Sequence, residues 1–266
     1  MYDRYQRRID YLRISVTDRC DLRCVYCWSL EEVELVRHED VLSLEEIHEV
    51  ATVAVDLGIR RIRLTGGEPL IRRGIVVLVE RIAAIPGLQE LAMTTNGTRL
   101  AELARPLAAA GLRRVNVSLD TLDPARFRDI TRGGELDRVL EGIAAARDAG
   151  LTPIKLNCVV QESSEEPDAR AVAAFAREHG FEARFIRQMN LRTGEFWVVE
   201  GGAGGDCARC GRLRLTCRGE VLPCLFSDLG YRVRELGPRG ALEAAVRHKP
   251  ASGRCSLDHG FHNVGG

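Results

Sequence analysis

The sequence predicts an α/β protein built on a parallel sheet. Short runs rich in β-branched residues alternate with amphipathic helical segments from about residue 12 to residue 188, and Gly-containing turns separate them. Six strands that alternate with helices favour right-handed crossovers, which make neighbouring strands parallel. We therefore expect the residues that follow each strand to meet at one edge of the sheet, where such folds place their sites.

The expected elements follow one another without long interruptions. Ser43 and Glu46 precede an apolar run and resemble a capping box, so the first helix is expected to start there. The six expected strands cover residues 12–16, 61–65, 91–95, 114–118, 154–160 and 182–188. The six expected helices cover residues 44–57, 74–84, 100–110, 123–130, 136–149 and 167–178.

Composition excludes several classes of protein. The chain has 266 residues, 45% hydrophobic and 29% charged, as in an ordinary globular protein of one large or two small domains. Its formal net charge is zero, which argues against a nucleic-acid partner bound through a broad basic field. The N-terminus lacks a signal-peptide core, and the longest aliphatic run, residues 75–79, is too short for a membrane. We expect a cytoplasmic location.

Three cysteines directly follow the first expected strand, in the sequence Cys20-Asp-Leu-Arg-Cys24-Val-Tyr-Cys27. Three thiolates can hold three corners of a cubane iron-sulfur cluster and leave the fourth iron open for a substrate or cofactor. The alternative is structural zinc, which is almost always closed by four ligands. No Cys or His at a suitable spacing supplies the fourth ligand, so the motif favours a reactive iron-sulfur cluster.

Polar turns follow the next three strands as well. They are Gly66-Gly-Glu-Pro69, Thr95-Asn-Gly97 and Ser118-Leu-Asp120. A glycine pair lets the backbone approach a ligand closely, and Glu68 is a candidate acceptor for a charged amine. Turn chemistry alone explains each motif singly, but four polar loops at one sheet edge favour a site.

A second cysteine group lies near the C-terminus, after a glycine-rich stretch at residues 201–205 that is expected to be a flexible connector. Cys207 and Cys210 form a CxxC pair, and Cys224 follows after thirteen residues. Because Cys217 or Cys255 could complete four ligands, the spacing leaves a zinc ribbon and a second cluster equally open.

A few basic residues stand out. Arg212 and Arg214 alternate on an expected extended segment, so they share one face and suit a phosphorylated ligand, although a solvated strand face is the commoner outcome. Lys155 is one of only two lysines among 38 basic residues and lies in an apolar run. Chance, or a side chain that extends to the sheet edge, would also explain it.

Together these motifs resemble the radical S-adenosylmethionine (SAM) superfamily and, within it, the MoaA family of GTP 3',8-cyclases, which start molybdenum-cofactor synthesis. The resemblance covers residues 12–189 and resumes at Cys207. It rests on LRISVTDRC with CxxxCxxC, RLTGGEPL, TTNG, VNVSLD, the second cysteine group, RLR and the Gly-Gly end.

The resemblance implies a partial (β/α)6 TIM-type barrel at residues 1–189, a shortened Gly-rich linker at 190–206, and a small C-terminal iron-sulfur domain at 207–266 with a Gly265-Gly266 tail. It implies two [4Fe-4S] clusters and SAM as cofactors. The first cluster is expected on Cys20, Cys24 and Cys27. The second is expected on Cys207, Cys210 and Cys224, with Cys217 or Cys255 as a possible extra ligand.

The resemblance also assigns the remaining site residues. The SAM contacts implied are Tyr26, Gly66, Gly67, Glu68, Asn96, Ser118 and Met189. The GTP contacts implied are Arg13, Arg63, Thr94, Lys155, Arg212 and Arg214, of which Arg212 and Arg214, like the first three cysteines, are expected to serve catalysis directly.

The implied reaction is that of a radical SAM lyase. Reductive cleavage of SAM gives a 5'-deoxyadenosyl radical, which takes hydrogen from ribose C3', and C3' then adds to guanine C8 to give 3',8-cyclo-7,8-dihydro-GTP. The implied partners are an electron donor such as flavodoxin or ferredoxin and the cyclic pyranopterin monophosphate synthase that takes the product. The chain is expected to be a monomer or homodimer, without nucleic acid or membrane.

The chain departs from the family pattern in three ways, and the additional Cys217 and Cys255 are the first. Only residues 190–206 stand where family members carry a much longer segment, and Arg187-Gln-Met-Asn190 replaces an acidic Glu-Phe-Met-Asp. Two alternatives therefore stay open. One is a MoaA-like radical SAM paralogue that acts on a peptide or another metal-cofactor precursor, and the other is a zinc-binding adaptor without catalysis.

Overall fold

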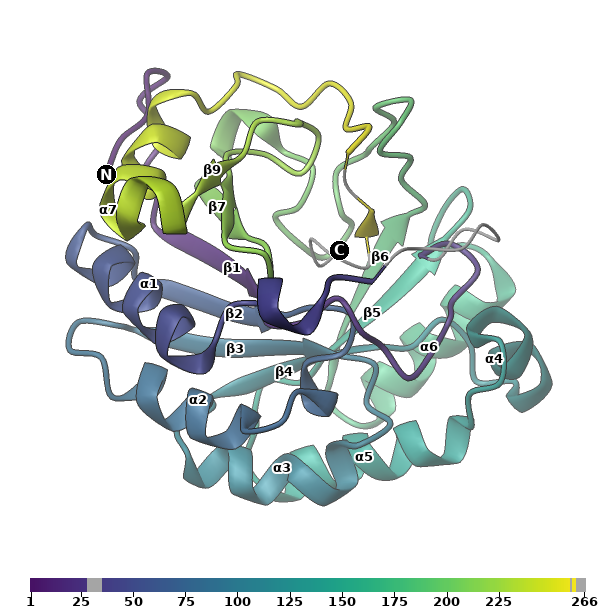
Figure 1. Ribbon diagram of the computed structural model, residues 1–266. Helices are drawn as coiled ribbons and strands as arrows, with labels where there is room; N and C mark the ends of the chain where they lie inside the picture. The colour runs from purple at the N-terminus through teal and green to yellow at the C-terminus, as the bar shows by residue number, and fades with distance from the viewer. Residues whose placement is uncertain (28–34, 259, 262–266) are drawn as a thin grey trace.

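A nine-stranded sheet with helices on its outer side forms the framework of the molecule (Figure 1). The computed structural model describes residues 1–27, 35–258 and 260–261. The strand order is β6-β5-β4-β3-β2-β1-β7-β8-β9, and β1 to β6 are parallel to one another. Because β6 and β9 stand at the two ends of this order, the sheet is an open, partial barrel, as predicted.

The six predicted strands are all present, with ends that shift by one residue at most. They are β1 (Tyr11–Ser15), β2 (Arg61–Thr65), β3 (Glu90–Thr95), β4 (Arg114–Ser118), β5 (Lys155–Val160) and β6 (Glu182–Arg187). The six predicted helices are present too: α1 (Leu44–Asp56), α2 (Ile75–Ala83), α3 (Leu100–Ala109), α4 (Pro124–Thr131), α5 (Leu136–Asp148) and α6 (Pro167–Glu178).

Helix α1 shows how the sequence sets these elements. Ser43 Oγ accepts a hydrogen bond from the Glu46 amide at 3.1 Å, and Glu46 Oε2 accepts one from the Ser43 amide at 2.7 Å, so the predicted capping box is confirmed. The helix then buries Ile47, Val50 and Ala54 at helical spacing against the sheet. This packing leaves the inner side of the sheet to the loops and to the C-terminal segment.

The C-terminal segment continues the same sheet. Strand β7 (Arg212–Leu215) pairs with β1 in parallel, and β8 (Glu220–Leu222) and β9 (Tyr231–Arg232) follow in antiparallel pairing. Helix α7 (Val233–Arg247) then packs against α1 (Figure 1). The second cysteine group is therefore fixed to the barrel by backbone pairing with its first strand.

The glycine-rich segment is folded, contrary to the prediction of a flexible connector. Phe185 of β6 and Glu200 exchange two backbone hydrogen bonds of 3.1 Å, and Arg187 lies 3.9 Å over the Trp197 ring. Gly205 has φ +80°, and a Cβ there would lie 2.0 Å from the Trp197 carbonyl oxygen. Glycine is thus needed for a tight turn that packs on the free edge of β6.

Two further observations bear on the sequence predictions. Among the described residues, no helix combines the length and apolarity needed to cross a membrane. The Gly265-Gly266 tail lies outside the described residues.

Candidate active site

Two adjacent cavities occupy the inner side of the sheet. The first, the thiol cavity, is lined by Cys20, Cys24 and Cys27. The second, the cationic cavity, is lined by arginines and by the second cysteine group. Asn157, Ile186 and Met189 line both, so a group bound in one cavity can meet a group bound in the other across these three residues.

The thiol cavity gathers the predicted loops at the carboxyl ends of β1 to β4. Besides the three cysteines, the lining includes most of the residues that the sequence predicts for SAM, namely Tyr26, Gly66, Gly67, Asn96, Ser118 and Met189, and also Thr94 from the predicted GTP set. Their proximity follows from the parallel topology, because consecutive strands end at the same edge. Their contacts with cofactor or substrate stay predictions.

The Gly66-Gly67 pair lies against the cysteine loop itself. A Cβ on Gly67 would stand 2.1 Å from the Arg19 carbonyl oxygen, and one on Gly66 2.6 Å from that of Thr17. The Gly67 amide donates to the Thr17 oxygen at 2.7 Å, and the Glu68 amide to the Arg19 oxygen at 2.8 Å. The close approach that the glycines permit is therefore to the residues just before Cys20.

Glu68 ties two loops together from inside the protein. Its carboxylate accepts hydrogen bonds from the Leu70 amide at 2.9 Å, from Thr95 Oγ1 at 2.8 Å and from the Asn96 amide at 2.7 Å. Full burial raises the pKa of Glu68 to about 7. Glu68 is not among the residues that line the thiol cavity, and protein donors take up its oxygens. Its predicted contact with a SAM amine stays a prediction.

Tyr26 is held by Asp120. The Tyr26 hydroxyl donates to Asp120 Oδ2 at 2.7 Å, and the Val159 amide donates to Asp120 Oδ1 at 2.8 Å. Burial raises the pKa of Asp120, and its two hydrogen bonds oppose that shift. The aromatic ring before Cys27 is thereby fixed between the ends of β4 and β5.

The three thiols fit an iron-sulfur cluster in their chemistry. Burial raises the pKa of Cys20, Cys24 and Cys27 to about 12 each, so these thiols need a cation to become thiolates. Iron supplies that charge, and a coordinating thiol is deprotonated outright.

The cationic cavity concentrates positive charge on neighbouring strands. Its lining includes Arg13, Arg63, Arg184, Arg212, Arg214 and Lys249, with Asp206 as the one carboxylate among the described lining residues. Arg13 stands in register with Arg63 on β2 and with Arg214 on β7, and strands lie about 4.8 Å apart. These three side chains are at most 7% exposed. Three buried like charges in adjacent positions are costly without an anion.

Burial and mutual repulsion of these arginines also lower their pKa values. Burial first, and then the charge of Arg212, lower the pKa of Arg214 to about 10. Burial likewise lowers the pKa of Arg13, with Arg214 as the next cause. Among the described residues, the Nε atoms of Arg63 and Arg184 are buried without a hydrogen-bond partner. Such orphaned donors fit an anionic ligand with several oxygen acceptors.

The structure adds residues that sequence reasoning missed. Arg184 of β6, Asn116 of β4 and Lys249 line the cationic cavity. Strand alternation was the available signal for Arg184, because it lies two residues before Ile186 on the same face. Lys155 shares the inner face of β5 with Asn157, but its ammonium pairs with Glu182 and it lines neither cavity. Its predicted GTP contact stays a prediction.

The second cysteine group enters the cationic cavity through Cys207, Cys210 and Cys224. Burial raises the pKa of Cys210, but the charges of Lys249 and Arg212 outweigh it and lower that pKa overall. Cys217 is buried and lines a different cavity, with Asp228 and Glu220, and Cys255 is exposed. The structure therefore gives no support to either as an extra ligand of this group.

Comparison with known proteins identifies the relatives of this arrangement. The family model of the radical SAM superfamily matches residues 14–176. A GTP 3',8-cyclase of Peptoclostridium acidaminophilum is 43% identical over 94% of this chain and 92% of its own length. One of Moorella thermoacetica is 44% identical over 92% of this chain and 88% of its own.

Solved structures share the fold at low identity. Streptococcus suis SuiB bound to its precursor peptide SuiA superposes with a TM-score of 0.68 at 15% identity, over 91% of this chain and 65% of that one. The enzyme anSMEcpe with bound AdoMet gives 0.63 at 14% identity, over 91% of this chain and 81% of that one. At such identities the likeness concerns the fold alone.

The alignments also show that this chain is shorter than its relatives over the matched region. The match to the P. acidaminophilum protein runs over 301 positions, whereas 94% of the 266 residues here is about 250, so about fifty positions have no counterpart in this chain. A Pseudomonas syringae relative is 53% identical over 191 residues, which is 72% of this chain. The shortening that the resemblance places at residues 190–206 stays a prediction.

Proposed function

This chain belongs to the radical SAM superfamily, and from that premise we propose that it is a GTP 3',8-cyclase of molybdenum-cofactor biosynthesis. The observation that carries the proposal is the buried row of Arg214, Arg13 and Arg63 directly beside a cavity lined by three thiols. Relatives of that name match more than nine tenths of the chain at about 40% identity, which supports the same conclusion.

The thiol cavity would hold the first [4Fe-4S] cluster on Cys20, Cys24 and Cys27, with SAM beside it. When bound, this pair supplies a carbon-centred radical that removes hydrogen from the substrate. The protein contributes rigidity. Glu68 fixes the β2 and β3 loops to each other, and Asp120 holds Tyr26, so the reacting atoms keep the distance that hydrogen transfer needs.

The cationic cavity would bind the triphosphate of GTP. Arg13, Arg63, Arg212, Arg214 and the structurally identified Arg184 surround one space from four strands, and guanidinium pairs bidentately with phosphate oxygens. Anchoring the phosphates there places ribose and base toward Asn157, Ile186 and Met189, the boundary with the thiol cavity. The predicted contacts of Thr94 and Lys155 extend this set.

The second [4Fe-4S] cluster would lie on Cys207, Cys210 and Cys224, in the same cavity as the phosphate anchors. A substrate held by its triphosphate would then lie between the two clusters. A peptide substrate gives no reason for five arginines around one space, so the lining favours a phosphorylated substrate over the peptide alternative.

The partners follow from this assignment. A small electron-transfer protein such as flavodoxin or ferredoxin would supply the electrons, and a cyclic pyranopterin monophosphate synthase would take the product. A nucleotide substrate agrees with the positive charge of the cationic cavity.

The proposal is tested by anaerobic reconstitution, metal analysis and one assay. Two cubane clusters require about eight irons and matching sulfide per chain. The reduced protein is then incubated with SAM and GTP, and the cyclised nucleotide is sought by mass spectrometry. Cyclised GTP supports the proposal, SAM cleavage with unchanged GTP favours the paralogue, and zinc without sulfide favours the adaptor.

A further inference from the structure

Lys249 is a buried cation that the proposed chemistry does not use. Its side chain is 2% exposed and is among the largest fully buried side chains of the described residues. Its ammonium donates to the carbonyl oxygens of Arg212 and Pro223 at 2.6 Å each. Among the ion pairs of the described residues, none joins Lys249 to a carboxylate. A buried charge needs compensation, so the source of the countercharge has to be identified.

The two carbonyl groups belong to the segments that carry two cysteines of the second group. Arg212 follows Cys210 by two residues, and Pro223 directly precedes Cys224. Lys249 therefore joins two chain segments whose cysteines, Cys210 and Cys224, are fourteen residues apart in sequence. All of these residues line the cationic cavity, except Pro223, whose carbonyl faces Lys249.

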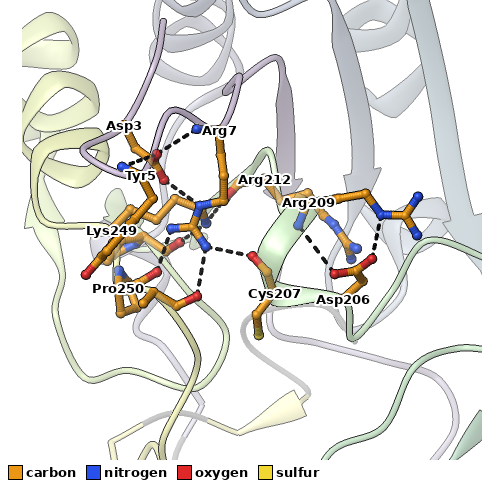
Figure 2. A network of polar contacts seen from close by, with 11 residues as sticks. Asp3, Tyr5, Arg7, Asp206, Cys207, Arg209, Arg212, Lys249 and Pro250 are labelled. Carbon is orange, nitrogen blue, oxygen red and sulfur yellow. Dashed lines mark hydrogen bonds and ion pairs between the residues drawn. The ribbon is translucent and has the colours of Figure 1, made fainter.

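Arg7 holds the backbone of the third cysteine, Cys207, next to the segment that carries Lys249 (Figure 2). Its guanidinium donates to the Cys207 carbonyl oxygen at 2.7 Å and to the Pro250 oxygen at 2.6 Å, next to Lys249. Asp3 holds Arg7 in place through an ion pair of 2.7 Å. Two cations from opposite ends of the chain thus bring the three cysteine-bearing segments together.

An ammonium has three donors, and the two carbonyl groups take two of them. One donor remains, and Lys249 lines the cationic cavity together with Cys210 and Cys224. We propose that Lys249 is the positioning residue and the fixed countercharge of the second iron-sulfur cluster. This proposal rests on the assignment of that cluster to Cys207, Cys210 and Cys224.

A fixed cation changes the redox behaviour of a cluster. Reduction adds a negative charge, so a buried ammonium beside a ligating sulfur stabilises the reduced state and raises the reduction potential. The described lining of the thiol cavity contains no Arg or Lys. The second cluster is therefore expected to be reduced at a higher potential than the first.

The test isolates the second cluster in a C20A/C24A/C27A parent, which cannot hold the first. In this background, Lys249→Gln keeps two donors for the carbonyl groups but removes the charge. Its midpoint potential, followed by EPR, is expected to fall by at least about 59 mV, a tenfold change in a one-electron equilibrium. Lys249→Met also removes the donors and is expected to lower the iron content.

Arg209 provides the matched control. It lies between Cys207 and Cys210, but its side chain is 87% exposed and pairs with Asp206 (Figure 2). Solvent screens such a charge, so Arg209→Gln is expected to leave the potential unchanged. An unchanged potential in Lys249→Gln, or an equal shift in Arg209→Gln, would overturn the proposal.

If Lys249→Gln loses iron, the fold of its apo-protein shows whether the substitution acts on the cluster or on folding. An apo-variant that folds like the parent, by circular dichroism and thermal unfolding, supports the positioning role, whereas an unfolded one overturns it. Absence of iron and sulfide in the parent itself would overturn both the second-cluster assignment and this proposal. A normal iron content with an unchanged potential would overturn this proposal alone.

Discussion

The two cavities differ in which part of the fold supplies their side chains and in how their charges are satisfied. The thiol cavity consists of short loops at strand ends, and its charged neighbours Glu68 and Asp120 are satisfied by protein donors. The cationic cavity draws its side chains from within β1, β2, β6 and β7, where Arg13 stands between Arg63 and Arg214. The loops of the first are joined by hydrogen bonds, whereas the described lining of the second gathers five arginines and Lys249 around one carboxylate, Asp206.

Because of this difference, substitutions in the two cavities are expected to affect stability and ligand binding differently. Residues of the thiol cavity hold one another, so a substitution there is expected to cost both folding and activity. The arginine row repels itself, so a substitution there is expected to cost binding but not folding. Substitutions in the two cavities are therefore expected to differ in what they change.

The largest effect is expected from the cysteines. Cys24→Ala should abolish SAM cleavage and all product, because a cluster without its third thiolate loses a corner ligand. Cys210→Ala should abolish the cyclised nucleotide while 5'-deoxyadenosine still forms slowly from SAM. Chromatography of both products under strong reductant checks the pair, and SAM cleavage that persists in Cys24→Ala would refute the division of roles.

Arg63→Met should separate binding from stability. A lost charge-assisted hydrogen bond costs about 1.5–3 kcal/mol, so kcat/KM for GTP should fall by about 10 to 100-fold. The apo-protein should unfold at an equal or higher temperature because a buried like charge is removed. Arg170→Met, which breaks an exposed ion pair with Glu165, serves as the control and should change neither quantity. A less stable apo-protein with unchanged kinetics would contradict the contrast.

Glu68→Gln, beside the thiol cavity, is expected to lower stability, which is the opposite of the result expected for Arg63→Met. An amide cannot accept all three hydrogen bonds, and one unpaired buried donor costs about 1–3 kcal/mol. Thermal unfolding of the apo-protein should therefore shift downward, and iron bound by the first loop should decrease. Glu45→Gln, at an exposed ion pair with Arg81, should be neutral. Equal stability of the two variants would show that the hydrogen bonds of Glu68 do not stabilise the loops after β2 and β3.

The smallest effect is expected at the glycine-rich segment. Gly205 and Gly180 both have positive φ, but a Cβ on Gly205 would meet the Trp197 oxygen at 2.0 Å, whereas one on Gly180 would meet nothing within 4 Å. Gly180→Ala should therefore show only the backbone cost, of about 1 kcal/mol. Gly205→Ala should show that cost and a several-fold higher KM for GTP. An equal KM in both variants would mean that this segment does not shape the cavity.

The sequence was sufficient for the barrel because its pattern is local. Strand and helix periods repeat from Tyr11 to Arg187, and each polar loop follows its own strand, so the parallel topology alone places Cys20, Gly66 and Asn96 together. The family was predicted from the same motifs and is confirmed. Strand β7 puts Arg212 and Arg214 on one face, as their alternation predicts for an extended segment.

What could not be predicted depends on contacts between distant segments. The pairing of β7 with β1, the fold of residues 190–206 on the edge of β6, and the burial of Lys249 each join parts of the chain far apart in sequence. The hydrogen bonds that Glu68 accepts from Thr95 and Asn96 could not be predicted, because these donors come from the turn after another strand. Arg184 was missed because one arginine in a mixed strand carries no motif.

The proposed function requires the thiol cavity and the cationic cavity to form one reaction chamber, and transfer of a labelled atom between substrate and cofactor tests this. The reconstituted, reduced protein is incubated with SAM and with GTP that carries deuterium at ribose C3'. If the account is right, the 5'-deoxyadenosine formed contains one deuterium and the nucleotide is cyclised. Unlabelled 5'-deoxyadenosine, formed while the labelled GTP is recovered intact, would contradict it.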